Sequence, residues 1–294
     1  MTTMSFTEAD SAALVAERLA KCTGPLPAFL VALIGHLHQA IRETRPTAAD
    51  WRRAIEFLTE VGHASDHRRQ EWVLLSDLLG VTALVEEINT RRPKGATPNT
   101  VRGPFYRADA PRVPLGATIS LDGIGEPLAV TTRVIDLDGY PVSGATVETW
   151  QANAQGLYEN QEPDLQPEFN LRGVFTTDAD GAFYYRTVRP GGYAVPCDGP
   201  VGRMLHAIGY PLRRPAHLHF VITAPGFETI STHVYDGRDP YLGEDALFGV
   251  KQELIGSFRP ADGADAGAAA KGERRWSLDF TFVMVRARKE RRSA

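Results

Sequence analysis

Cysteine, long apolar runs and clustered positive charge are all scarce in this sequence. Only two cysteines occur among 294 residues, Cys22 and Cys197, and two isolated thiols argue against a disulfide-stapled scaffold or a cysteine zinc site. No apolar run approaches the roughly 20 residues that a membrane-spanning helix needs. The opening residues, MTTMSFTEAD, lack the basic and then apolar pattern of a secretion signal. We therefore expect a cytoplasmic protein without membrane insertion.

The charge and the composition restrict the class of protein further. The net charge is −4 and the pI is near 6.1. Lysines and arginines do not gather into a long stripe, so no nucleic-acid partner is expected. Hydrophobic residues make up 43% and charged residues 23% of the chain, which is typical of a globular protein with a proper core. This composition excludes a disordered or fibrous protein and suits one large or two ordinary domains.

Residues 1–95 have the apolar spacing of helices. Apolar residues recur at intervals of three and four, and Thr7 with Asp10 and Thr47 with Asp50 form capping arrangements. Four amphipathic segments imply a helical layer whose apolar stripe must be buried against something. The predicted helical segments are 6–22, 25–44, 47–62 and 70–91.

Residues 96–294 have instead the pattern of a β-rich domain. The connector RRPKGATPNTVRGPFYR, rich in proline and glycine, leads into it. Short strands with regular turns and no helices between them predict an antiparallel β-sandwich, and the turn DADG at 178–181 predicts a hairpin. The expected fold class is therefore mainly β with α, a β-sandwich (96–294) preceded by a helical region (1–95). The predicted strands are 128–136, 145–152, 173–177, 182–188, 216–223, 229–236 and 276–287.

The stretch RRPAHLHF, at 213–220, carries two histidines one residue apart. Because side chains alternate along a strand, His217 and His219 share one face, while Leu218 and its apolar neighbours share the other. A shared metal ion would satisfy two adjacent neutral imidazoles. Two hydrogen-bonded histidines at the rim of a sheet are the alternative, and this stretch alone leaves both open.

Two tyrosines next to predicted strands are candidates for oxygen ligands. Tyr158 lies in ANAQGLYEN and Tyr193 in RPGGYAVPCDGP, a loop rich in glycine and proline. Glycine allows a close approach of backbone to a site, and proline holds a loop in one shape. Since tyrosine at a strand end is more often a packing residue, neither position is diagnostic by itself.

The segments QANAQGLYEN, RTVRPGGYAVPCDGPVGRMLHAIGY and RRPAHLHFVITAPGF, in this order, resemble the iron-binding signature of the intradiol ring-cleaving dioxygenases. Within that family, PCDGPVG, RPAHLHF and HVYDGRDPYLGEDALFGVK are most similar to hydroxyquinol 1,2-dioxygenases, with catechol 1,2-dioxygenases as relatives. The resemblance spans nearly the whole chain, because the family also begins with a helical dimerisation region.

The resemblance implies a non-haem Fe(III) held by Tyr158, Tyr193, His217 and His219. Two phenolates and two imidazoles form a hard, electron-rich ligand set that suits ferric iron. The implied reaction is intradiol cleavage of a catechol-type diol by O2 in aromatic catabolism, with hydroxyquinol (benzene-1,2,4-triol) as the expected substrate and a 3-hydroxymuconate as the product. Tyr193 would also be displaced by the substrate and accept one of its protons.

Further roles follow from the same resemblance. Arg214 is expected to stabilise negative charge that develops on the ring. Asp77 is a candidate partner for a third ring hydroxyl, although it could equally cap a helix break. Arg102 departs from the family pattern and either faces the substrate or turns to solvent. The expected substrate-binding residues are Leu74, Asp77, Val101, Arg102, Gly103, Pro104, Phe105, Val195, Pro196, Arg214 and His233, the last standing where catechol enzymes carry glutamine.

The sequence leaves alternatives for the function, and the resemblance also implies a partner. The substrate could instead be catechol or a substituted catechol, and a metal-free β-sandwich binding module would explain the strands without the ordered tyrosines and histidines. An extradiol or zinc enzyme would need a carboxylate or a further histidine as ligand. The family leads us to expect a homodimer through the N-terminal helices, with a lipid bound there in some relatives.

Overall fold

The computed structural model describes residues 5–66, 70–261 and 275–287. The chain divides into two compact units, residues 1–63 and 64–294, and each is described by itself. The secondary structure changes from helix to strand further along, after residue 89. The predicted boundary between 95 and 96 refers to this second change and stays a prediction. Among the described residues, no helix combines the length and the apolar character needed to cross a membrane.

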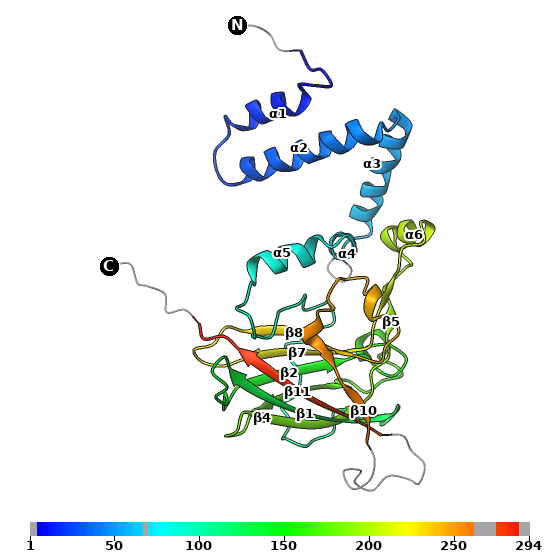
Figure 1. The fold of residues 1–294 in the computed structure, drawn as a ribbon. Coiled ribbons are helices and arrows are strands. Elements are labelled where there is room, and N and C mark those ends of the chain that lie inside the picture. Colours follow the sequence, from blue (N-terminus) through cyan, green and yellow to red (C-terminus); the bar gives the residue numbers. More distant parts are fainter. Residues whose placement is uncertain (1–4, 67–69, 262–274, 288–294) are drawn as a thin grey trace, which may run out of the picture. The chain divides into compact units, whose positions relative to one another are not determined.

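The first unit is a set of three helices, α1 (Ser11–Leu19), α2 (Leu26–Thr44) and α3 (Ala48–His63) (Figure 1). The cap predicted for α3 is confirmed, because the Asp50 amide donates to the Thr47 hydroxyl (3.2 Å) and the Thr47 amide to the Asp50 carboxylate (3.0 Å). The side chains of Thr7 and Asp10 are also hydrogen-bonded (2.7 Å), but this pair spans the turn at 8–10, and α1 begins directly after it.

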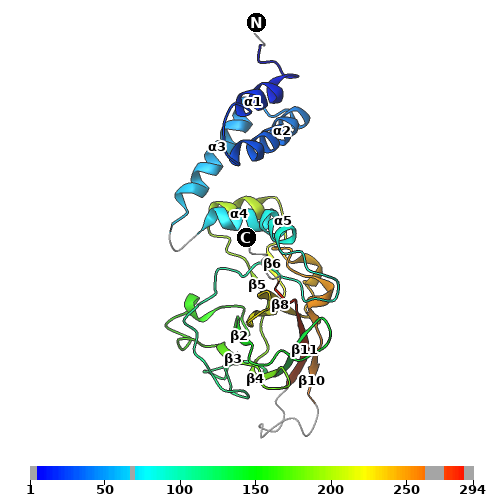
Figure 2. The same ribbon diagram turned by 90° about the vertical axis from the view of Figure 1, so that its left-hand side faces the viewer.

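The predicted helical segment 70–91 consists of two helices, α4 (Glu71–Leu78) and α5 (Val81–Asn89). Gly80 ends the first of them with a φ of 72°, a left-handed conformation that glycine adopts without strain. With α6 (Pro200–Ala207), these helices lie together beside the strands β5, β6 and β8 (Figure 2). The Tyr210 hydroxyl donates to the Leu78 carbonyl (2.9 Å), which ties the segment after α6 to the end of α4.

Two facing sheets form the sandwich predicted for the second unit. A four-stranded sheet has the order β10-β11-β1-β4, a five-stranded sheet the order β3-β2-β7-β8-β9, and β5 pairs with β6 separately. The strands are β1 (Pro127–Asp136), β2 (Thr146–Gln151), β3 (Arg172–Thr176), β4 (Ala182–Val188), β5 (Tyr193–Ala194), β6 (Arg213–Arg214), β7 (His217–Thr223), β8 (Ile230–Asp236), β9 (Ile255–Gly256), β10 (Phe258–Pro260) and β11 (Trp276–Met284), with 3-10 turns η1 (Glu159–Gln161), η2 (Leu242–Glu244) and η3 (Gln252–Leu254).

Two details of the predicted strand pairing are wrong, and α6 lies between strands where no helix was expected. The sheets are mixed rather than purely antiparallel, because β1 pairs with β11 and β8 with β9 in parallel. No tight turn joins either pair, so nothing local imposes an antiparallel direction. The turn at 178–181 does not make a hairpin either, since β3 pairs with β2 and β4 pairs with β1. That turn carries the chain from one sheet to the other.

The core between the sheets explains how β7 is oriented. Leu218, Phe220 and Ile222 belong to the main buried cluster, so the predicted alternation is confirmed and the two histidines lie on the opposite face. That face is buried as well, since His217 and His219 are each only 2% exposed. Burial on both faces is the reason that the polar residues of β7 must be satisfied by protein groups or by a bound ion.

Candidate functional site

Pairing between β7 and β8 assembles the centre of the site. His217 stands opposite Tyr235 and His219 opposite His233, and opposite residues of an antiparallel pair point to the same face. On the other side of β7, Trp150 of β2 stands opposite His219, and the two rings stack with centroids 4.6 Å apart. Three neighbouring strands therefore present their aromatic side chains to one buried space.

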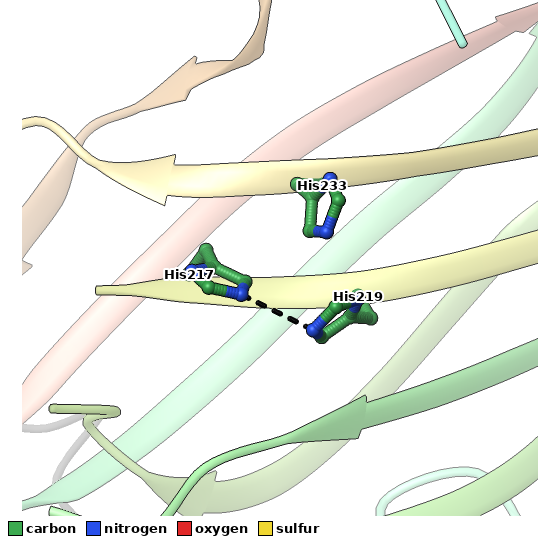
Figure 3. Close-up of side chains that lie close together, drawn as sticks. All are labelled: His217, His219 and His233. Atoms are coloured by element: carbon green, nitrogen blue, oxygen red, sulfur yellow. Dashed lines mark hydrogen bonds between the residues drawn. The ribbon is translucent and has the colours of Figure 1, made fainter. Parts of the chain in front are cut away.

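The three histidines lie close enough to share a ligand (Figure 3). The Nε2 atoms of His217 and His219 are 3.1 Å apart, and one nitrogen from each of the three rings lies within 4.8 Å of the others. Burial, helped by the positive charge of Arg214, lowers the pKa of His217 to about 3. Burial likewise brings the pKa values of His219 and His233 well below their usual range. All three rings are therefore neutral at pH 7, the form in which imidazole binds metals.

Tyr158, from the loop before η1, and Tyr193, from β5, complete this cluster. Tyr158 precedes η1, and its hydroxyl lies 2.7 Å from Nε2 of His219. Tyr193 is paired with Arg214 in the β5–β6 ladder, and its ring centroid is 5.9 Å from that of Tyr158. Burial, and next the charge of Tyr193, raises the pKa of Tyr158 well above its usual value, so its phenolate needs a nearby positive charge to form.

Glycines allow the two tyrosine loops to come this close. A Cβ on Gly156 would stand 2.7 Å from the Cβ of Tyr193, and the φ of Gly156 is +86°. A Cβ on Gly191 would stand 2.4 Å from the Ala154 carbonyl oxygen. Any larger residue at either position would push the loops apart, which explains the glycines that the sequence places around both tyrosines.

Among the described residues, the hydrogen bonds of the histidines leave some of their ring nitrogens without a partner. Nδ1 of His217 lies 2.6 Å from the Pro215 carbonyl oxygen. This carbonyl can only accept, so Nδ1 carries the proton and Nε2 has a lone pair. Within the described part of the chain, Nδ1 of His219 and Nε2 of His233 are buried without any hydrogen-bond partner. A buried space lined by phenol oxygens and neutral imidazole nitrogens has the donor atoms that a metal site would use.

Arg214 brings a fixed positive charge to the edge of the cluster. Its Nη1 lies 3.3 Å from the Tyr193 hydroxyl, and its Nε donates to the Asp245 carboxylate at 3.0 Å. Burial by itself would lower the pKa of Arg214, but the neighbouring Tyr193, Asp245 and Tyr235 outweigh that effect and raise it. The guanidinium therefore remains charged although it is almost completely buried.

Several residues predicted to bind substrate surround this cluster. Phe105 stacks on Tyr158 with ring centroids 4.3 Å apart, and a Cβ on Gly103 would stand 3.5 Å from the His219 ring. Val101, Arg214 and His233 line one pocket together with Leu247 and Phe248. Phe105 and Pro196 line a second hollow beside Tyr193. Val195 is buried and Pro104 exposed in the adjoining loops.

Three further predicted residues lie on α4 and in the connector that precedes the sandwich. Leu74 is half-buried on α4. Asp77, on the same helix, is buried, with Oδ1 lacking a hydrogen-bond partner within the ranges that the structure covers. Burial raises the pKa of Asp77 against the opposing influence of Thr82 and Arg214. Arg102 is exposed, and its guanidinium lies 4.8 Å from the centroid of the Tyr106 ring.

Sequence reasoning missed three residues that the fold brings to the site: Trp150, Tyr235 and Asp245. The period of two in HVYD places Tyr235 on the same face as His233, so this signal was available. Trp150 becomes a neighbour of His219 only through the register of β2 with β7. Asp245 comes from a turn after η2, and no periodic pattern marks such a residue.

Comparison with known proteins identifies the family of this chain. The family described as "Dioxygenase" matches residues 101–285, and that described as "Catechol dioxygenase N terminus" matches residues 26–97. The chain is 47% identical over 285 residues to a hydroxyquinol 1,2-dioxygenase of Rhizobium sp., covering 96% of each protein. It is 44% identical to a 6-chlorohydroxyquinol 1,2-dioxygenase of Cupriavidus pinatubonensis, covering 87% of this chain and 89% of the relative. The crystal structure of a hydroxyquinol 1,2-dioxygenase from Pseudomonas putida DLL-E4 superposes with a TM-score of 0.88 at 40% identity, covering 95% of this chain and 99% of that one.

Proposed function

This chain belongs to the intradiol ring-cleaving dioxygenases, and we propose that its substrate is hydroxyquinol. The ring bond between the two adjacent hydroxylated carbons breaks, both atoms of O2 enter the product, and 3-hydroxy-cis,cis-muconate forms, whose keto tautomer is maleylacetate. The observation that carries this assignment is the 47% identity to a hydroxyquinol 1,2-dioxygenase across 96% of each protein.

Tyr158, Tyr193, His217 and His219 are the residues that would hold a non-haem iron. This assignment is supported by two phenol oxygens and two imidazole nitrogens that converge on one buried space. Among them, the Tyr158 hydroxyl lies 2.7 Å from Nε2 of His219. Two phenolates contribute two negative charges, which favour Fe(III) over Fe(II). When bound, the metal supplies Lewis-acid activation and a template that orients the diol.

The chain's own residues handle the protons and the charge. Tyr193 is half-buried and close to Arg214, so its phenolate is placed to accept a proton from a substrate hydroxyl as the diol binds. The Arg214 guanidinium stabilises the negative charge that develops on the ring, and it acts strongly because it is shielded from water. Phe105 and the loop around Gly103 close one side of the cluster and exclude water.

Asp77 is the residue to which we assign recognition of the third ring hydroxyl. Its buried Oδ1 has no hydrogen-bond partner among the residues with described positions, and a substrate hydroxyl would supply one. Asp77 also forms a hydrogen bond with Thr82, so the alternative is that it only caps the helix break between α4 and α5. The contribution of Arg102 to selectivity also stays a prediction, because its guanidinium lies over Tyr106 at the surface.

Steady-state kinetics on the iron-loaded protein test the function. We expect the highest kcat/KM with hydroxyquinol, and Asp77→Ala should lower that value by about tenfold while changing the value for catechol little, since only the triol loses a hydrogen bond. A higher kcat/KM for catechol would instead identify a catechol 1,2-dioxygenase. A colourless protein without bound iron and without oxygen uptake would favour the binding module.

The homodimer through the N-terminal helices is also part of this proposal. The first unit exposes large apolar side chains, among them Phe29, Trp51 and Ile55. It contains a hollow of about 400 Å³ that Phe6, Leu37 and Ile41 help to line. Such surfaces favour association and suit a bound acyl chain. Light scattering gives the mass, and mass spectrometry of an organic extract detects a lipid. Cytoplasmic location remains an expectation.

A further inference from the structure

We propose that Asp245 is a positioning residue for ring cleavage, acting by holding the Arg214 guanidinium in its working orientation. The inference rests on the proposed function, since it assigns to Asp245 a role in that reaction. Asp245 lies in the turn that follows η2, and its side chain is only 2% exposed. It contacts the arginine rather than the ring pocket, so it acts through Arg214.

Three contacts fix the plane of the guanidinium. Its Nε donates to Oδ1 of Asp245 at 3.0 Å, and its Nη2 to the Tyr235 hydroxyl at 3.2 Å. The Tyr235 hydroxyl in turn lies 3.3 Å from Oδ2 of Asp245. With these two edges occupied, Nη1 points to the Tyr193 hydroxyl (3.3 Å) and to Nε2 of His217 (3.5 Å). The side of the guanidinium that faces the candidate ligands is therefore selected by Asp245 and Tyr235 together.

The carboxylate itself is held by the backbone of its own turn. The amide of Gly249 donates to Oδ2 at 2.8 Å, and the amide of Leu247 lies 3.4 Å from Oδ1. The Ala246 amide donates to the carbonyl of Arg213 at 2.9 Å, which ties the turn to β6 beside Arg214. A Cβ on Gly249 would stand only 2.3 Å from the Tyr235 hydroxyl. The turn is thus shaped closely around the Arg214 and Tyr235 contacts.

The same turn forms part of the pocket wall near the histidines. Leu247 and Phe248 line the pocket that Arg214 and His233 also line. His233 lies next to His217, with ring centroids 4.9 Å apart (Figure 3). One short segment therefore carries both the acceptor that orients the arginine and apolar side chains beside it. This arrangement favours a role in placing the charge over a role in folding alone, because a charge mispositioned by about 1 Å can cost on the order of a hundredfold in rate.

Asp245→Asn is the first variant to examine. The asparagine side chain has only one acceptor oxygen, and its NH2 group is a donor. It therefore cannot accept from both Arg214 and the backbone amides, so the guanidinium should lose its fixed orientation. We expect kcat with hydroxyquinol to fall by about tenfold to a hundredfold, KM to change less than about threefold, and the iron content to stay unchanged. Asp245→Glu, which keeps the charge, should recover part of kcat.

Asp136→Asn is the matched control for the loss of a buried acid. Asp136 is 3% exposed and pairs with Arg286 at 2.7 Å at the end of β1, in the other sheet. This variant should lower Tm and leave kcat unchanged. If Asp245→Asn fails to fold, Tyr235→Phe replaces it, because this change removes one contact to the guanidinium without removing a charge. It should lower kcat in the same selective way.

A double-mutant cycle separates positioning from other effects. In an Arg214→Lys background, the ammonium has no Nε to orient, so Asp245→Asn should change the remaining kcat by less than about threefold. An equal loss of kcat in both backgrounds would overturn the proposal, and so would a wild-type kcat in Asp245→Asn. Absence of ring cleavage by the wild-type protein would contradict the proposed function instead, which keeps the two failures distinct.

Discussion

The surroundings of Tyr158 show why a phenolate at this site would need a nearby positive charge. Its ring is completely buried, burial raises its pKa, and its hydroxyl lies 2.7 Å from an imidazole nitrogen. A phenolate at such a position needs a cation. At the residue scale, the neutral histidines and the buried tyrosine therefore both support the proposed metal ion.

Substitution of a proposed ligand should remove the metal. Tyr158→Phe and His219→Ala should each lower the iron content by at least about tenfold, because each removes a donor atom from a buried set. Elemental analysis and the visible tyrosinate-to-iron band measure the result. Tyr185→Phe is the control, since Tyr185 is equally buried but belongs to the core between the sheets. Full iron and an unchanged spectrum in both ligand variants would remove these two residues from the ligand set.

The displaced ligand should behave differently. Tyr193→Phe should retain part of its iron, because Tyr193 is only half-buried and is the ligand that we propose the substrate displaces, but kcat/KM should fall by on the order of a hundredfold through loss of a proton acceptor. Stopped-flow spectra during substrate binding and steady-state oxygen uptake give the two quantities. Wild-type turnover in this variant would contradict the role of Tyr193.

The buried histidines predict how the iron-free protein responds to acid. Their folded pKa values lie below the unfolded value of about 6.5, so their contribution to stability is complete above pH 6.5. It is lost as the pH falls, by up to about 1.4 kcal/mol per pH unit for each ring. Urea unfolding at several pH values between 7.5 and 5 measures the slope. His233→Gln should reduce the histidine part of that slope by about a third, and an unchanged slope would mean that His233 is not held neutral.

At the scale of elements, the break between α4 and α5 contributes to the pocket as the strands do. Gly80 has a φ of 72°, and a Cβ there would stand 3.2 Å from the Phe248 ring, which lines the pocket with Arg214 and His233. The glycine therefore links a helix corner to the pocket wall. Strand register likewise brings Tyr235 to the site, because β8 pairs with β7.

Gly80→Ala should both strain the corner and press on the pocket. We expect unfolding to become easier by about 1–2 kcal/mol from the left-handed conformation, together with a raised KM for hydroxyquinol from displacement of Phe248. Gly35→Ala is the control, because Gly35 lies within α2 with no atom near its missing Cβ. That change should stabilise its helix by up to about 1 kcal/mol. Equal effects of the two substitutions on Tm would contradict this account of Gly80.

At the scale of the whole molecule, metal binding should couple to the stability of the second unit. The proposed ligands come from β5, β7 and the loop before η1, so one ion would tie together segments that are distant in sequence. Bound iron at a thousand times its Kd would stabilise the folded state by about 4 kcal/mol. Calorimetry should show a Tm that falls by several degrees after chelation and returns on adding iron. A Tm indifferent to iron would mean that the ion binds elsewhere or not at all.

Much of this molecule followed from local sequence patterns. The alternation in AHLHFVIT placed both histidines on one face, and the glycines beside Tyr193 indicated a close approach of backbone to a site. The boundaries of most strands were also predicted to within one or two residues. These features depend on side-chain periodicity and on backbone conformations of single residues, which act over a few positions.

Other features were decided by tertiary structure alone. The pairing of His219 with Trp150 and His233, the parallel partners of β1 and β8, and the separation of β3 from β4 all depend on register and direction between distant strands. Asp245 meets Arg214 because a turn folds back over β6. Contacts of this kind depend on how whole sheets bury their apolar faces, and a local sequence pattern does not determine that arrangement.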